Sequence, residues 1–280
     1  MNNNKHPHGS WLGLACAIVI FSGYAYAEEA PGKTLTLGML PSRSTVTLYQ
    51  RFAPLRDYLS EKLGYKLVFE TTPDYDLFLK QSQQGKYDFI LTAPHYALLT
   101  MDSGYYDISA TYKNPLAAVI LVHQQSNIKS LHELAGKQIA TPPLQAIITM
   151  AGKHYLSKSG LTGSKKPVYI LSRTHSASLH TVLVKESDAA IVSTNVARHA
   201  QNRGYPVRKL AQSPDIPSMA WLVAKRLPYR LREQFGNLLI NMHKNAEGRK
   251  VLKKINYDGY RKATRQEFEP VRAYLNSNWK

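Results

Sequence analysis

The chain has 280 residues, of which 44% are hydrophobic, a share that is ordinary for a globular protein and sufficient for one large domain or two lobes. Lysine and arginine number 36 against 19 acidic residues, so the formal net charge is +17. This charge permits three kinds of partner: nucleic acid, an anionic membrane surface or small anions. The basic residues are spread along the chain without a nucleic-acid-binding motif, which argues against nucleic acid.

The densest basic clusters are Lys165-Lys166, Arg249-Lys250 and Lys253-Lys254. We interpret them as parts of a solvated basic surface. The alternative is a protein that binds anionic surfaces, and it predicts lysines gathered on one face. The sequence alone does not clearly show such a face.

Residues 1–27 have the features of a secretory signal peptide. Lys5 is followed by an apolar stretch over residues 11–21, too short for a membrane span of roughly 20 residues, and then by the small-residue site Ala25-Tyr26-Ala27. We expect cleavage after Ala27, a mature chain that begins at Glu28 with a net charge of +16, and a periplasmic location. The single cysteine, Cys16, would leave with the signal peptide, so we expect no disulfide, thiolate metal site or cysteine nucleophile.

The first part of the mature chain alternates between strand and helix patterns. Strands are predicted over residues 33–40, 66–70 and 87–91, and helices over 48–63, 73–83 and 94–101. In the first helix, Pro54 favours a start near residue 52 over an unbroken helix. Short connections between alternating elements predict a parallel sheet that helices cover on both faces.

A second alternation follows over residues 117–212, and a mainly helical segment ends the chain. Strands are predicted over residues 117–123, 137–140, 168–171, 189–192 and 218–224, and helices over 130–135, 143–157, 175–184, 196–202, 228–245 and 265–276. We therefore predict an α/β fold with two lobes, residues 33–115 plus 217–280 and residues 116–216, and a ligand cleft between them. Hinges are expected near Asn114-Pro115 and Asp215-Ile216-Pro217.

Ligands of open α/β sheets bind at the carboxyl ends of strands and at helix N-termini. The loops predicted at these places are rich in hydroxyl and amide groups and poor in carboxylates, which suits an anion or a neutral polar ligand. They span residues 42–45, 92–96, 141–145, 172–176, 193–195 and 217–219. The chain carries none of the motifs of serine hydrolases, zinc proteases, P-loop proteins or dinucleotide-binding proteins, so we expect no enzymatic activity, metal or cofactor.

Short motifs along nearly the whole mature chain resemble one family. They are Leu37-Gly38-Met39-Leu40-Pro41, Gly85-Lys86-Tyr87-Asp88, Ala93-Pro94-His95-Tyr96, Leu131-His132-Glu133-Leu134-Ala135-Gly136-Lys137, Thr174-His175 and Asp188-Ala189-Ala190. In order and spacing they resemble the periplasmic substrate-binding proteins of phosphate, phosphite and phosphonate ABC transporters. The resemblance implies the two-lobed type II periplasmic-binding fold and a small oxyanion as ligand.

The family's anion pocket can be carried over only in part. Tyr96 matches its loop aromatic residue, and His175 matches its pocket histidine, although Ser176 follows here where the family has aspartate. The family's Ser-Thr-Ser cluster should fall at Pro143-Leu144-Gln145, where the hydroxyls are missing and proline removes a donor. A phosphonate dianion would lose several charge-assisted hydrogen bonds there, so the sequence leaves the ligand open.

We predict ligand-binding residues from both lobes because closure requires contacts that only the closed state makes. Each lies just past the carboxyl end of a predicted strand and can donate a hydrogen bond: Ser44, Thr45, Tyr96, Thr141, Gln145, His175 and Thr194. Core packing would also explain Tyr96, and helix capping would explain Ser44.

The expected function is capture of a small oxyanion for an inner-membrane ABC permease. Two alternatives remain open at this point: a sensory receptor that signals to a membrane histidine kinase, and an enzyme built on the same fold. The sequence does not distinguish transport from sensing, name the ligand or give the oligomeric state.

Overall fold

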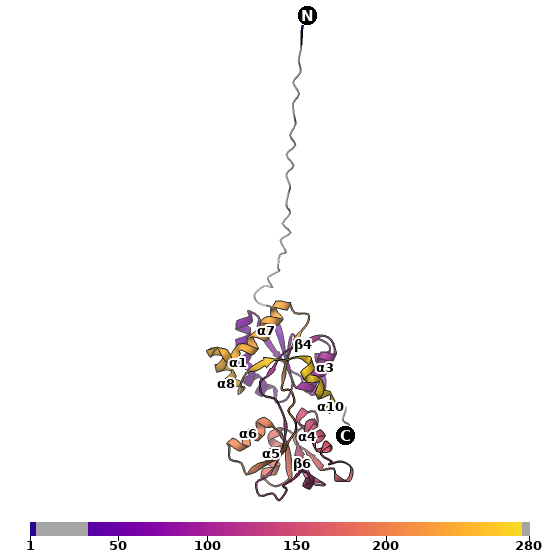
Figure 1. Ribbon diagram of the computed structural model, residues 1–280. Helices are drawn as coiled ribbons and strands as arrows, with labels where there is room; N and C mark the ends of the chain where they lie inside the picture. The colour runs from indigo at the N-terminus through magenta and orange to yellow at the C-terminus, as the bar shows by residue number, and fades with distance from the viewer. Residues whose placement is uncertain (4–32, 276–280) are drawn as a thin grey trace. The chain divides into compact units, whose positions relative to one another are not determined.

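The computed structural model describes residues 1–3 and 33–275 (Figure 1). The predicted signal sequence from residue 4 onward and the expected cleavage site after Ala27 lie outside the described residues. Within these residues the chain forms two separate β-sheets, each with helices on both faces. No helix in the described ranges combines the length and the hydropathy needed to cross a membrane.

The first sheet has six strands in the described chain, in the order β11-β4-β10-β3-β1-β2. The strands are β1 (Thr34–Met39), β2 (Lys66–Glu70), β3 (Phe89–Thr92), β4 (Tyr106–Tyr112), β10 (Ala220–Ala224) and β11 (Tyr260–Lys262). β1 pairs in parallel with β2 and β3, whereas β10 runs antiparallel between β3 and β4. The helices are α1 (Thr45–Leu63), α2 (Tyr75–Gln83), α3 (Pro94–Asp102), α7 (Tyr229–Asn241), α8 (Ala246–Ile255), α9 (Arg265–Phe268) and α10 (Arg272–Leu275).

The second sheet has five strands among the residues described, in the order β7-β6-β8-β5-β9. The strands are β5 (Ala118–His123), β6 (Gln138–Thr141), β7 (Val168–Leu171), β8 (Ala189–Ser193) and β9 (Val207–Gln212), and the helices are α4 (Ile147–Lys158), α5 (His175–Leu183) and α6 (Thr194–Asn202). Alternate residues of β5 enter two different cores: Ile120 packs in the cluster that includes α4, and Val119 packs in the cluster with α5 and α6. Burial on both faces explains why this strand is continuously apolar.

The α/β class with two sheets is confirmed, but both sheets are mixed rather than purely parallel. The sequence analysis missed β4, β9 and β11 and also the helix α8. In β4, Asp107 and Ser109 interrupt the apolar pattern, and pairing with β10 and β11 holds the strand in the sheet. The predicted helix over 228–245 stopped where α8 begins, and Asn245 caps this further helix by accepting a hydrogen bond from the Gly248 N–H.

The expected start of α1 near residue 52 was wrong. The helix begins at Thr45, behind an N-cap at Ser44, and continues through Pro54. Pro54 removes one backbone donor, but the buried side chains Leu48, Phe52 and Leu55 on either side of it pack in the first core and hold the helix together.

The chain passes between the sheets twice, after β4 and after β9. Leu116 and Ile216 meet where the two passages run side by side and exchange backbone hydrogen bonds of 2.9 and 2.8 Å. Prolines at positions 115, 214 and 217 restrict the backbone around this pair.

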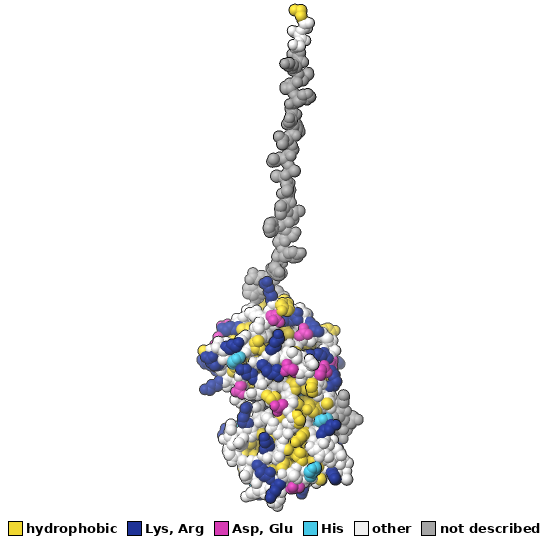
Figure 2. All heavy atoms as spheres, viewed as in Figure 1, with side chains coloured by type: hydrophobic (Ala, Val, Ile, Leu, Met, Phe, Trp, Pro, Cys, Tyr) yellow, Lys and Arg dark blue, Asp and Glu magenta, His cyan; other side chains and the backbone are white. Residues whose placement is uncertain are grey.

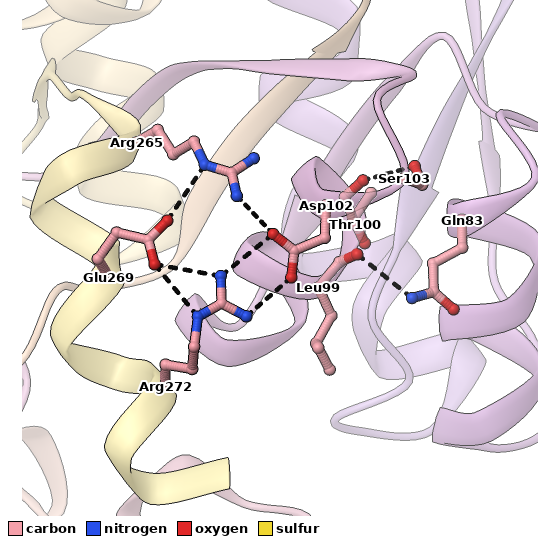
Figure 3. A network of polar contacts seen from close by, with 8 residues as sticks. All are labelled: Gln83, Leu99, Thr100, Asp102, Ser103, Arg265, Glu269 and Arg272. Carbon is pink, nitrogen blue, oxygen red and sulfur yellow. Dashed lines mark hydrogen bonds and ion pairs between the residues drawn. The ribbon is translucent and has the colours of Figure 1, made fainter. Parts of the chain in front are cut away.

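The C-terminal segment contacts helices of both sheets. On α3, the carboxylate of Asp102 accepts hydrogen bonds from Arg265 and Arg272, and both arginines also pair with Glu269 (Figure 3). Immediately beyond, Val271 is buried in the core cluster of the second sheet, and the Tyr274 ring meets the His154 ring of α4 edge-on at 5.2 Å. The segment is therefore held at one end by α3 and at the other by α4.

We predict that Asp102→Asn lowers the free energy of unfolding by about 1 kcal/mol, because two guanidinium groups lose a shared carboxylate in a partly exposed network. Urea unfolding followed by far-UV circular dichroism measures this. Asp57→Asn is the matched control, because Asp57 pairs only with the neighbouring Arg56 at the surface. Equal unfolding midpoints for the two variants would contradict a structural role for the network.

Candidate functional site

The polar groups of interest lie at the carboxyl ends of parallel strands in both sheets. In the first sheet, Thr92 ends β3, and α3 starts two residues later with Pro94 at its first turn. In the second sheet, Thr141 ends β6, His175 is the first residue of α5 after β7, and Thr194 is the first residue of α6 after β8. Thr174 and Ser193 cap α5 and α6 by accepting hydrogen bonds from backbone N–H groups, which fixes where these helices begin.

A hydrogen bond joins the carboxyl edge of the first sheet to that of the second. The side chain of His95, which is 1% exposed, places Nε2 3.0 Å from the backbone oxygen of Gln145 in the loop after β6. A carbonyl oxygen can only accept, so Nε2 carries the proton and Nδ1 is a bare acceptor. Burial lowers the pKa of His95 to about 4, so the ring is neutral at neutral pH.

Buried polar atoms without a hydrogen-bond partner are found at several of these strand-to-helix junctions. Twelve buried side-chain nitrogen or oxygen atoms find no hydrogen-bond partner in the described part of the chain, and five of them lie on these strand-to-helix junctions. The five are Thr92 Oγ1, His95 Nδ1, Thr141 Oγ1, His175 Nδ1 and Thr194 Oγ1. A buried group left unsatisfied costs about 1–3 kcal/mol, and these five atoms are able to hydrogen-bond a polar ligand.

His175 is the first residue of α5, and the charge of Arg43 acts on its ring. Burial is the main cause that lowers its pKa to about 4, and the guanidinium of Arg43 adds to the effect. Arg43 lies in the loop between β1 and α1. Because its charge lowers the pKa of His175, we infer that this loop lies near the start of α5. Arg43 is exposed and forms no ion pair with a described residue, so its guanidinium is able to interact with an anion.

Tyr96 is part of an aromatic stack beside His95. Its ring is 6% exposed, lies 4.2 Å from the His95 ring and stacks on Tyr75 at 6.0 Å with an interplanar angle of 19°. Burial raises the pKa of Tyr96, so the phenol stays protonated and remains a potential donor.

The other predicted residues are placed differently. Ser44 is exposed, and its hydroxyl accepts from the Thr47 N–H at 3.3 Å, so capping of α1 accounts for it. Thr45 is exposed in the first turn of α1. Gln145 is exposed too, and it reaches His95 through its backbone oxygen rather than its amide.

The helix expected to begin at Pro143 begins only at Ile147. Residues 142–146 form a turn instead, closed by a hydrogen bond from the Ala146 N–H to the Pro143 oxygen. This turn carries Gln145 to His95, so the loop that lacks the expected hydroxyls makes the contact between the two edges instead.

The sequence analysis did not select Thr92, His95 or Arg43, although all three lie in loops that it named. His95 stood next to Tyr96 in the Ala93-Pro94-His95-Tyr96 motif. Arg43 was the single charged residue in the loop 42–45, a signal that could have singled it out.

Comparison with known proteins places the chain in one family. Residues 37–268 match the family described as "ABC transporter, phosphonate, periplasmic substrate-binding protein". The phosphonates-binding periplasmic protein of Escherichia coli K12 is 21% identical over 265 residues, which is 89% of this chain and 77% of that protein.

Solved structures agree in fold. The binding protein of an ABC phosphonate transporter from Pseudomonas aeruginosa aligns with a TM-score of 0.70 at 16% identity over 87% of this chain and 85% of its own. A protein of Prochlorococcus marinus in complex with methylphosphonate aligns with a TM-score of 0.73 at 16% identity, over 86% of this chain and 97% of its own. Because the family match extends from β1 to α9, the chain belongs to the periplasmic substrate-binding proteins of ABC phosphonate transporters.

Proposed function

We propose that this protein captures a small phosphonate-like oxyanion between two lobes and delivers it to an ABC permease in the inner membrane. The lobes are residues 33–115 plus 217–280 and residues 116–216, and the hinge is the pair of passages that meet at Leu116 and Ile216. One observation carries the proposal: five buried polar atoms without partners come from the carboxyl edges of both sheets.

The chemistry of these groups suits an oxyanion. The hydroxyls of Thr92, Thr141 and Thr194 can each donate to a phosphonate oxygen, and the neutral ring of His175 can donate through one nitrogen. The N-termini of α5 and α6 and the guanidinium of Arg43 add positive potential without burying a second full charge.

His95 adds a preference for a ligand that carries a proton. Its Nδ1 can only accept, because Nε2 donates to the Gln145 oxygen. A singly protonated phosphonate or phosphate has an O–H that can satisfy this acceptor, whereas sulfate at neutral pH has none. We therefore place methylphosphonate and phosphate ahead of sulfate as ligands.

Of the seven predicted residues, Tyr96, Thr141, His175 and Thr194 remain our proposed ligand contacts, with Gln145 acting through its backbone. Ser44 and Thr45 stay in the proposal only as part of the loop that carries Arg43.

A thermal-shift screen of the mature protein against methylphosphonate, phosphate, phosphite and sulfate tests the ligand class. A ligand at a hundred times its dissociation constant should add about 2.7 kcal/mol to the stability.

His175→Ala is expected to weaken binding of the best ligand in that screen by about 10- to 150-fold, the effect of a lost hydrogen bond to a charged group. Isothermal titration calorimetry on the mature protein measures the change. His180→Ala is the control, because His180 lies on the exposed side of the same helix. Unchanged affinity in the His175 variant would remove this residue from the site.

Acid is expected to destabilise the protein through His95. The unfolded chain takes up this proton near pH 6.5, whereas the folded protein does so only near pH 4. Unfolding is therefore favoured as the pH falls from 6.5 towards 4, and His95 alone accounts for a loss on the order of 2–3 kcal/mol at pH 4.5.

Urea midpoints at pH 7.0 and 4.5 test this for the wild type and for His95→Asn, whose amide can still donate to the Gln145 oxygen. The difference between the two pH values should shrink in the His95 variant and stay unchanged in His132→Asn, at an exposed position. The same acid sensitivity in all three proteins would show that His95 is not the group responsible.

A further inference from the structure

Five basic side chains gather on and beside α8, far in sequence from the proposed ligand contacts. We call them the α8 basic face; all five are exposed, and they are Lys244, Arg249, Lys250, Lys253 and Lys254. Dark blue side chains cover the part of the surface where Figure 1 labels α8 (Figure 2). The family assignment gives this face no role.

The position of the face follows from the amphipathic pattern of α8. Gly248, Val251, Leu252 and Ile255 are buried, and the three larger side chains pack in the core of the first sheet. The N-cap at Asn245 and the left-handed C-cap at Asn256 fix both ends of the helix. The charges are therefore held on a rigid element rather than on a loop.

Ion pairs among the described residues do not account for these charges, although Arg249 donates a hydrogen bond to the His243 oxygen at 3.3 Å. None of the five takes part in an ion pair with a described residue, and the single acid of the helix, Glu247, pairs with Lys62 of α1 at 2.8 Å. Arg249 and Lys250 each stand one turn from Lys253 or Lys254, a spacing at which like charges destabilise a helix. The helix dipole favours Lys253 and Lys254 in the last turn but disfavours Lys244 before the first.

We propose that the α8 basic face docks the protein on an anionic lipid surface, the phosphatidylglycerol-type headgroups of the membrane that holds its permease. Protein partners are recognised by aromatic and apolar anchors, and lysine is depleted in their interfaces. The apolar side chains of α8 are buried, and four of the five charges are lysines, which interact as hydrated point charges. Such a face suits a bilayer surface, whose negative charge is diffuse. Each lysine that lies near this surface adds to the electrostatic attraction.

Binding of this kind is reversible and depends on ionic strength. The Debye length is about 8 Å at physiological salt, so the attraction acts only when the face lies near the headgroups. The protein would be concentrated on the membrane surface without being anchored there, and it could still exchange between free and docked states.

Co-sedimentation of the mature protein with vesicles tests the proposal. Binding is expected to vesicles that contain phosphatidylglycerol and not to phosphatidylcholine alone, and it should be lost between about 0.05 M and 0.5 M salt. The triple variant Lys250→Glu/Lys253→Glu/Lys254→Glu should bind at least about tenfold more weakly. The triple variant with glutamine at the same three positions should lose less vesicle binding than the glutamate variant. It replaces the glutamate variant in the test if the charge reversal disturbs folding.

The matched control is Lys137→Glu/Lys165→Glu/Lys166→Glu, which changes the net charge equally at exposed positions near the second sheet. It should keep vesicle binding. An equal loss in both triple variants, or no preference for phosphatidylglycerol, would overturn the proposal. A different outcome is that the α8 variants bind vesicles normally but no longer bind the detergent-solubilised permease. The α8 basic face would then contact an acidic protein surface, and the lipid proposal would be wrong.

Discussion

Two backbone hydrogen bonds between Leu116 and Ile216 are the interaction on which the arrangement of this protein depends. They fasten together the two passages of the chain between its sheets, at the one isolated β-bridge among the described residues. Both residues also pack in or against the core of the second sheet, so apolar burial supports the pair. We propose that the lobes hinge here, because the neighbouring prolines leave few torsion angles that can change.

The C-terminal segment adds a second connection of another kind. Ionic contacts hold it to α3, and apolar contacts of Val271 and Tyr274 hold it to the second core. A surface ion pair is easily replaced by water, whereas a buried valine is not. If the lobes move about the proposed hinge, the C-terminal segment would stay with the second sheet. The ion pairs that hold the segment to α3 would then have to break.

The site itself shows why stability and function are in tension. Buried threonine and histidine groups without partners destabilise the protein, and the cores of the two sheets offset this cost through continuous apolar burial. Neutral histidines are less costly to bury than charged ones, and they can still donate or accept. In the proposed function, a ligand would gain binding energy by satisfying groups that the fold leaves unsatisfied.

The sequence was sufficient for the α/β class and for the positions of most buried strands along the chain. It was not sufficient where tertiary contacts override local pattern. Pro54 lies inside α1 because buried side chains hold the helix on both sides of it, and β4 is a strand because β10 and β11 pair with it. His95 was passed over because its role depends on Gln145, fifty residues away, a contact that no local pattern reveals.

The loop after β6 shows how far a family motif can be carried over. Its sequence, Pro142-Pro143-Leu144-Gln145, lacks the hydroxyls that the resemblance led us to expect, and α4 starts too late for its N-terminus to lie where that cluster would stand. The same loop supplies the carbonyl that fixes the tautomer of His95. Hydroxyls then remain at the strand ends, at Thr92, Thr141 and Thr194, rather than at the N-terminus of α4. These are the side chains to which our proposal assigns anion recognition, with the loop after β6 positioning His95 on α3.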